Sequence, residues 1–248
     1  MISMQISKAA NTLQAKYQGE DVCFTGCSTD TRTLKDKELF IALRGENFDG
    51  HDYLDKAKAL GASAVLVEEK YVGTSSSAGS FAGPSIVVKN TRQAMGALAK
   101  NWRAGFSIPL VAITGSNGKT TVKEMVVGIL SCEASVLATQ GNLNNDIGVP
   151  LTLFGLGEEH QYAVIEMEPT IRVRLNGYLT LPNQLLPRLP NVHRLTLRGL
   201  EVLRVSRTPN LKFLMDCWRM VLPSLMAMMT SLNYGWKKVI TPTSVPLD

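Results

Sequence analysis

The sequence of 248 residues has little cysteine, little histidine and few aromatic side chains. It contains four cysteines, three histidines and 6% aromatic residues. The cysteines, at positions 23, 27, 132 and 217, have no partners at metal-ligand spacing, and their small number favours a reducing compartment. We therefore predict no metal site built on cysteine, and we expect Cys23 and Cys27 to be a buried pair of small side chains.

Long apolar runs are also missing. No stretch approaches the roughly 20 residues of a membrane span, and the first residues lack a basic segment followed by an apolar run, so no signal peptide is expected. These absences predict a cytoplasmic protein without a membrane partner, and we expect it to be a monomer.

Acidic residues are scarce in the last third only. Residues 1–168 carry 15 Lys and Arg against 18 Asp and Glu, whereas residues 169–248 carry 11 against three. The net charge of +5 therefore comes from the last 80 residues. A nucleic-acid-binding protein is disfavoured, because this basic segment lacks interleaved aromatic residues on one face and lacks the signature of a known module.

The most informative stretch runs from Ile108 to Thr121. A short apolar strand, Leu110 to Ile113, leads into Thr-Gly-Ser-Asn-Gly and then into a helical pattern from Lys119 to Leu130. Strand, glycine loop, Lys-Thr and helix form the context of a phosphate-binding loop. One departure is that Ile113 stands where the general motif has its first glycine. The alternative is an ordinary strand-to-helix turn that happens to carry Gly-Lys-Thr.

Strands alternate with helices before this loop, which predicts a small α/β domain ending near Phe106. The expected helices are 6–17, 53–60 and 91–102, and the expected strands are 39–43, 62–67 and 86–89. Beyond the loop we expect a strand at 135–139, a short helix at 152–156 and a buried strand at 162–167. The predicted domains are 1–106, 107–167 with a parallel-sheet nucleotide-binding fold, and a tail, 168–248, without a native fold.

Several motifs resemble those of the Mur ligase family. They are Ser28-Thr-Asp-Thr-Arg32, Leu39-Phe-Ile-Ala-Leu-Arg-Gly45, Phe48-Asp-Gly-His-Asp-Tyr53 and Thr114-Gly-Ser-Asn-Gly-Lys-Thr-Thr121. The resemblance implies that the N-terminal domain binds a UDP-sugar, with candidate contacts at Ser28, Asp30, Arg32, Asp49, Gly50 and His51. On spacing alone, these residues are ordinary loop and cap polar groups.

The same resemblance implies that ATP contacts the second domain. The candidates are Thr114, Gly115, Ser116, Asn117, Gly118, Lys119, Thr120, Thr121, Asn142 and Asn145. The resemblance assigns Mg²⁺ to Thr120 and Glu166, and the catalytic roles to Lys119 and Glu166. A carboxylate at the carboxyl end of a parallel strand beside a phosphate loop suits a metal; the alternative is a strand-end carboxylate that faces solvent.

The loop Gly141-Asn-Leu-Asn-Asn-Asp-Ile-Gly148 resembles that of the family members that act on UDP-N-acetylmuramoyl-tripeptide and D-alanyl-D-alanine. The expected function is therefore ATP-dependent amide-bond formation in peptidoglycan synthesis, through an acyl phosphate. Two alternatives stay open: a related ligase that adds the third peptide residue, and a non-catalytic UDP-sugar-binding remnant.

The resemblance stops after Met167. The family continues Gly-Ala-Asn-His-Pro-Gly-Glu-Ile, and one coding of that run, read one base later, gives Glu168-Pro-Thr-Ile-Arg-Val-Arg-Leu175. A second match in the same frame extends over 195–236. We therefore expect residues 168–248 to be a frameshifted translation, and we expect this chain to lack the dipeptide site and ligase activity.

Overall fold

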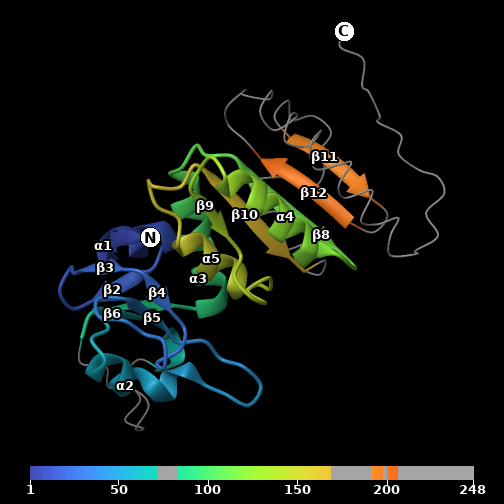
Figure 1. Cartoon of the computed structure of the whole chain (residues 1–248). Helices are drawn as coiled ribbons and strands as arrows, with labels where there is room; N and C mark the ends of the chain where they lie inside the picture. The colour runs from blue at the N-terminus through green and yellow to red at the C-terminus, as the bar shows by residue number, and fades with distance from the viewer. Residues whose placement is uncertain (72–82, 169–191, 198–199, 206–248) are drawn as a thin grey trace.

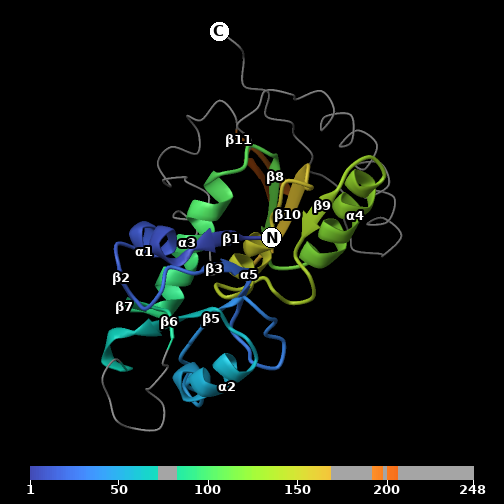
Figure 2. The same cartoon turned by 90° about the vertical axis from the view of Figure 1, so that its left-hand side faces the viewer.

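The computed structural model describes residues 1–71, 83–168, 192–197 and 200–205 of the chain. Two five-stranded sheets with helices between and around them make up most of this part (Figures 1 and 2). A small antiparallel pair, β1 (Ser3–Gln5) and β3 (Cys23–Thr25), lies beside them. The predicted α/β class is confirmed, with parallel strands at the centre of both sheets.

The first sheet has the strand order β2-β7-β6-β5-β4. Its strands are β2 (Lys16–Gln18), β4 (Cys27–Ser28), β5 (Leu39–Ile41), β6 (Ala64–Glu68) and β7 (Ser85–Val88). All neighbours pair in parallel except β2, which runs antiparallel to β7. Because parallel strands place their carboxyl ends at one edge, the loops after β4, β5, β6 and β7 share that edge.

Helices cover both faces of the first sheet, which explains its nearly continuous apolar strands. Phe40 and Val65 face α2 (Leu54–Ala59), which follows the 3₁₀ turn η1 (Gly50–Tyr53). Alternate residues such as Ile41 and Leu66 face α1 (Ile6–Leu13) and α3 (Thr91–Ala104).

The second sheet has the order β11-β12-β8-β10-β9. Its strands are β8 (Leu110–Gly115), β9 (Val136–Ala138), β10 (Tyr162–Met167), β11 (Val192–Leu197) and β12 (Leu200–Val205). β8, β10 and β9 are parallel, whereas β12 runs antiparallel to β8 and to β11. Val111 and Ile113 of β8 face α4 (Lys119–Ser131), and Leu110 and Ala112 face the opposite side.

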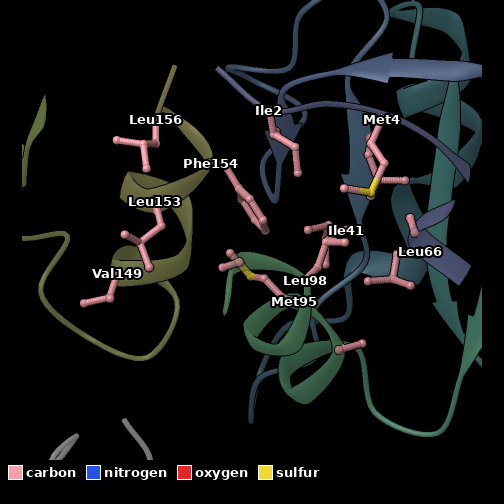
Figure 3. Packing of buried hydrophobic residues seen from close by; sticks show 14 of the residues in the cluster. Ile2, Met4, Ile41, Leu66, Met95, Leu98, Val149, Leu153, Phe154 and Leu156 are labelled. Atoms are coloured by element: carbon pink, nitrogen blue, oxygen red, sulfur yellow. The ribbon is translucent and has the colours of Figure 1, made fainter. Parts of the chain in front are cut away.

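One hydrophobic core joins the two sheets. Helix α5 (Gly148–Phe154) packs against α3, and Phe154 points from α5 toward Ile2 and Met95 (Figure 3). The backbone N–H of Ile2 donates to the carbonyl oxygen of Phe154 (2.6 Å), and Trp102 Nε1 donates to that of Leu156 (3.0 Å). The predicted boundary near Phe106 falls between the two sheets, but one hydrophobic core includes residues from both sides of it. The proposed division into domains stays a prediction.

Most expected elements are present with shifted ends. The predicted strand 162–167 coincides with β10, and the predicted helix 152–156 is wrong in its limits, because α5 begins at Gly148 and ends at Phe154. The predicted helix 6–17 ends at Leu13, since Gln14 adopts a left-handed conformation and the chain turns into β2. The expected burial of both cysteines is wrong for Cys23, which is exposed on the two-stranded sheet, whereas Cys27 is half-buried.

Within the tail, for which no native fold was expected, the structure describes Glu168 and the strands β11 and β12. These strands extend the second sheet along the edge of β8. The remaining positions of the proposed out-of-frame segment, 169–191, 198–199 and 206–248, lie outside the described residues.

Candidate active site at the phosphate loop

The predicted phosphate-binding loop connects β8 to α4, as its sequence pattern indicated. Gly118 immediately precedes the helix with φ of +75°, a left-handed conformation that favours glycine, and a Cβ there would meet no atom within 4 Å. Ser116, Asn117 and Gly118 are exposed. The first turn of α4 therefore presents its backbone amides at an accessible loop, which is the arrangement that binds phosphate.

Lys119 and Thr120 are the first two residues of α4. Lys119 is half-buried, and its Nζ donates to the carbonyl oxygen of Gly115 at 2.9 Å, so its ammonium lies back over the loop. Thr120 is exposed at the same helix end. Both side chains are therefore placed at the loop where an anion would lie.

Two buried oxygen atoms beside the loop have no hydrogen-bond partner. They are Thr114 Oγ1 and Glu166 Oε2, and no other buried side-chain nitrogen or oxygen in the described part of the chain is left without one. Thr114 and Glu166 are each 2% exposed, and they lie on neighbouring parallel strands, where Met167 pairs with Thr114. An unpaired buried polar group is costly, so such atoms mark a place that a ligand can complete.

The other oxygen of Glu166 is held in place by the asparagine-rich loop, residues 141–148. Glu166 Oε1 accepts from Asn144 Nδ2 (3.0 Å), and the Glu166 backbone N–H donates to Thr139 Oγ1 (2.9 Å). The alternative, a strand-end carboxylate that faces solvent, is therefore wrong. A hydroxyl at Thr120 and a carboxylate at Glu166 are the oxygen donors that Mg²⁺ prefers, and Mg²⁺ commonly takes only one or two protein oxygens besides water and phosphate.

Asn142 and Asn145, the two predicted ATP contacts in this loop, are both exposed. Asn145 Oδ1 accepts from the backbone N–H groups of Ile147 (3.1 Å) and Gly148 (2.7 Å). This oxygen is therefore already hydrogen-bonded to the start of α5. A Cβ at Gly148 would lie 2.4 Å from the Leu143 backbone, which explains the glycine. The loop is thus fixed by its own contacts with α5.

The predicted UDP-sugar residues gather at the carboxyl edge of the first sheet. Ser28 Oγ donates to the Asp30 carbonyl oxygen (3.0 Å) in the loop after β4. Arg32 Nε and Nη2 both donate to Asp30 Oδ2, at 2.9 and 2.6 Å, and this pairing lowers the pKa of Asp30 and raises the pKa of Arg32. The Arg32 side chain is 83% exposed, so its guanidinium is accessible to a ligand.

His51 lies in a closed cluster instead. Its side chain is fully buried; Nδ1 is 2.6 Å from Asp49 Oδ1, and Nε2 accepts the Glu68 backbone N–H at 3.0 Å. Its ring stacks on Tyr71, with centroids 3.7 Å apart, and the Tyr71 hydroxyl donates to Asp49 Oδ2. Both ring nitrogens are occupied, so His51 positions the loop and has no ring nitrogen left for uridine.

Charge and burial in this cluster shift two pKa values. Burial, with a further contribution from Asp49, raises the pKa of Tyr71 to about 12. Burial also tends to raise the pKa of Asp49, but hydrogen bonds from Tyr71 and His51 outweigh it and leave that pKa below its usual value.

Gly50, another predicted UDP-sugar contact, is explained by packing. It is buried, its N–H donates to the Leu43 carbonyl oxygen (2.7 Å), and a Cβ would lie 2.8 Å from Leu43 N. The close approach of two backbones therefore requires glycine here, independently of any ligand.

An ion pair connects the two candidate regions. Arg92, in the first turn of α3 after β7, places Nε 3.4 Å from Oδ2 of Asp146 in the asparagine-rich loop. The carboxyl edge of the first sheet therefore lies next to the loop that holds Glu166.

A cavity of about 660 Å³ is lined by residues of α1, β2, β7 and α3, including Lys16 and Gln93, and by Lys89 between β7 and α3. None of the predicted site residues lines it.

No helix of the described residues is long and apolar enough to span a bilayer. These residues also contain no group of three or more His, Cys, Asp or Glu able to hold a metal ion.

Comparison with known families agrees with this geometry. Residues 24–103 match the model described as Mur ligase family, catalytic domain, and residues 113–177 match the Mur ligase middle domain. The chain belongs to the Mur ligase family. The middle-domain match continues beyond Met167, where the likeness was expected to stop.

Two individual relatives carry the same name. The UDP-N-acetylmuramoyl-tripeptide–D-alanyl-D-alanine ligase of Escherichia coli (strain K12) is 47% identical over 167 residues, which are 67% of this chain and 35% of the relative. The ligase of the same name from Buchnera aphidicola subsp. Acyrthosiphon pisum is 34% identical over 205 residues, 82% of this chain and 43% of the relative. The crystal structure of MurF from Acinetobacter baumannii aligns with a TM-score of 0.60 at 34% identity, over 68% of this chain and 36% of that structure. The chain spans a little over a third of the first relative's length.

Sequence reasoning missed three residues of this site. Thr139, Asn144 and Lys123 connect α4, the end of β9 and Glu166 through hydrogen bonds. Lys123 could have been noticed, since it follows Val122 on the apolar side of the predicted helix, one turn after Lys119. Thr139 gave no signal, because its role depends on which strands are neighbours.

Proposed function

We propose that this chain supplies the UDP-sugar-binding and ATP-binding parts of a ligase that joins D-alanyl-D-alanine to UDP-N-acetylmuramoyl-tripeptide in peptidoglycan synthesis. The observation that carries the proposal is the pair of unpartnered buried oxygens, Thr114 Oγ1 and Glu166 Oε2, beside an accessible phosphate loop. The names of the relatives, and the likeness in the asparagine-rich loop, support the dipeptide-adding reaction over the addition of the third peptide residue.

In this proposal the loop from Thr114 to Thr121 binds the phosphates of ATP through backbone amides and the Lys119 ammonium. On binding, Lys119 leaves the Gly115 carbonyl and turns to the outer phosphates, where its charge offsets the negative charge that develops during phosphoryl transfer. Thr120 and Glu166 would hold Mg²⁺, whose chemistry is to neutralise and orient phosphate oxygens.

The reaction proposed for the whole enzyme has two steps. The γ-phosphoryl group of ATP passes to the terminal carboxylate of the tripeptide, giving ADP and an acyl phosphate; the dipeptide amine then displaces phosphate and forms the amide bond. The proposed UDP-sugar contacts are Ser28, Asp30 and Arg32, with Asp49, Gly50 and His51 shaping the neighbouring loop. We also propose that this chain alone does not complete the ligation.

Nucleotide binding provides the direct test. The change is Lys119→Met, with Lys100→Met on α3 as the matched control, because Lys100 is distant from the loop in sequence and belongs to another helix. Loss of a charge-assisted contact predicts ADP binding that is about 10- to 100-fold weaker for Lys119→Met and unchanged for Lys100→Met, measured by isothermal titration calorimetry with Mg²⁺. Equal affinity in the two variants, or no saturable binding by the unmodified chain, would contradict the proposal.

Binding of UDP separates the two open functions. A chain that binds UDP equally well with and without Lys119→Met, and never binds ADP, is a UDP-sugar-binding remnant rather than part of a ligase. Binding of both nucleotides, each weakened only by changes in its own region, supports the ligase.

We further propose that residues 168–248 result from a reading-frame shift after Met167. Resequencing the genomic DNA across codons 160 to 175 tests this. One additional base after codon 167 would restore the family reading. A confirmed DNA sequence without that base leaves a disrupted copy of the gene. The matches of the sequence as written that run past Met167 count against the shift in either case.

A further inference from the structure

Lys123 is the only buried lysine among the described residues, with 3% of its side chain exposed. It lies one helical turn after Lys119, on the face of α4 that packs on the second sheet. Burying an ammonium group is costly unless it is paired and hydrogen-bonded. An apolar side chain would serve the packing of α4 equally well, so the charge itself calls for an explanation.

The contacts of Lys123 are specific. Its Nζ donates to the carbonyl oxygen of Thr139 at 2.9 Å and lies 2.7 Å from Oε1 of Glu124. The Glu124 side chain is 64% exposed, so its contribution is screened by water. The bond to Thr139 is the buried one.

Thr139 uses three of its groups to connect the elements of the site. Its N–H donates to the Val164 carbonyl oxygen (3.1 Å), its carbonyl oxygen accepts from Lys123, and its hydroxyl oxygen accepts the N–H of Glu166 (2.9 Å). It stands at the end of β9, directly before the asparagine-rich loop. A shift of Thr139 would therefore move the backbone that carries the Glu166 carboxylate.

The asparagine-rich loop holds the carboxylate of Glu166. Asn144 Nδ2 donates to Glu166 Oε1, and the Asn144 carbonyl oxygen accepts the N–H of Glu168 (2.9 Å). Glu166 is thus fixed at its backbone by Thr139 and at its carboxylate by Asn144, with Oε2 left without a partner. A carboxylate that is fixed with one unpaired oxygen is oriented for a cation.

We propose that Lys123 is a positioning residue: through Thr139 it fixes the asparagine-rich loop and Glu166 in the orientation that accepts Mg²⁺ with the nucleotide. The inference rests on the proposed function for the identity of the ligand. What the inference adds is that Lys123, through Thr139, sets how much Mg²⁺ is needed for tight nucleotide binding. Lys123 itself does not contact the nucleotide.

The test compares Lys123→Met with Glu124→Gln in the full chain. Partners of metal ligands typically change metal affinity by about 10- to 100-fold when removed. In Lys123→Met we expect the Mg²⁺ concentration that gives half of the maximal tightening of ADP binding to rise about tenfold or more, with ADP affinity in EDTA unchanged. Glu124→Gln should behave as the unmodified chain, and Lys123→Arg should recover part of the loss, because it restores a charged donor.

Hydrogen exchange of the ligand-free chain gives a second measurement that needs no nucleotide. We expect faster amide exchange at 139–146 and 164–168 in Lys123→Met, and no change there in Glu124→Gln. The double variant Lys123→Met with Thr139→Val should require no more Mg²⁺ than the more impaired single variant, because both substitutions act through one residue.

Two results would overturn the inference. One is an equal loss of ADP affinity with Mg²⁺ and in EDTA, which indicates general damage to α4. The other is unchanged exchange in both segments. If the unmodified chain binds no ADP, the proposed function fails and the metal role of Lys123 fails with it, while the exchange comparison still decides whether Lys123 positions Glu166.

Discussion

The carboxyl edges of the two sheets differ in how their buried polar groups are satisfied. At the first edge, His51, Asp49, Tyr71 and the Glu68 backbone bond to one another. At the second edge, Thr114 Oγ1 and Glu166 Oε2 are buried without partners. The same kind of edge is therefore self-contained in one sheet and incomplete in the other.

This difference separates a loop at the first edge that is fixed before a ligand binds from a site at the second edge that lowers the stability of the ligand-free chain. Buried groups without partners lower the stability of the ligand-free chain, and proteins retain such groups where binding needs them. The closed cluster at His51 instead fixes the loop that carries Asp49 and Gly50. If this comparison holds, removing a polar group of the closed cluster at the first edge should be destabilising, whereas removing one of the unpartnered groups at the second edge should not.

The largest expected effect is at His51. His51→Ala removes a fully buried ring, its stacking on Tyr71 and the acceptor of the Glu68 N–H. We expect the free energy of unfolding to fall by about 3 kcal/mol, through a cavity and an unpaired donor, measured by urea denaturation. The matched control is His160→Ala, since His160 Nδ1 accepts one N–H, from Gly157, at a loop; equal losses in the two variants would remove the distinction drawn for His51.

A smaller effect is expected at Tyr71. Tyr71→Phe removes the hydroxyl that donates to Asp49, and we expect a loss of about 1 kcal/mol at neutral pH. The pKa of Asp49 is lowered in the folded chain, so its stabilisation is present above its ordinary pKa of 3.8 and is lost as the pH falls below it. The pKa of Tyr71 is raised from 10.0 to about 12. The stabilisation that Tyr71 contributes is therefore present below pH 10 and is lost as the pH rises through 12.

The difference in unfolding free energy between Tyr71→Phe and the unmodified chain should therefore be constant near neutral pH and shrink toward both extremes. Urea denaturation across the pH range measures it. Tyr17→Phe, a change at an exposed tyrosine of β2, should show no such profile. A difference that does not depend on pH would show that the Tyr71 hydroxyl is not coupled to the Asp49 carboxylate.

The smallest effect has the opposite sign. Thr114→Val keeps the shape of the side chain and removes a buried hydroxyl that has no partner, so the ligand-free chain should become more stable by up to about 1 kcal/mol. Thr139→Val, the same chemical change, removes the acceptor of the Glu166 N–H and should be destabilising. Thermal unfolding of the two variants gives the comparison, and a destabilising Thr114→Val would mean that the second edge is as complete as the first.

Local patterns predicted the parts of the structure that depend on neighbours in sequence. The change from the apolar run Leu110 to Ile113 to a glycine loop and a helical stripe correctly located β8, the loop after it and the start of α4. Glu166 was placed at the end of a buried strand for the same reason. Both follow from the periodicity of a few adjacent residues.

Features that depend on distant pairing could not be predicted in this way. The strand β2 pairs with β7, 67 to 71 residues away, and its sequence Lys-Tyr-Gln has no apolar alternation. His51 was a candidate contact for the UDP-sugar, and its closed surroundings could not be predicted, because they depend on Glu68 and Tyr71 from the next strand and its following turn. Thr139 next to Glu166 likewise depends on the parallel pairing of β9 with β10.

The contact between Ile2 and Phe154 has a consequence for the order of events during synthesis. Ile2 is fully buried, and its N–H bonds to a residue of α5. At about 5–20 residues per second, the ribosome needs on the order of 10 s to reach Phe154 after adding Ile2. Over that time the start of the chain lacks the partner that buries it, so the shared core closes only after all strands of the first sheet, and β8 and β9 of the second, have been synthesised.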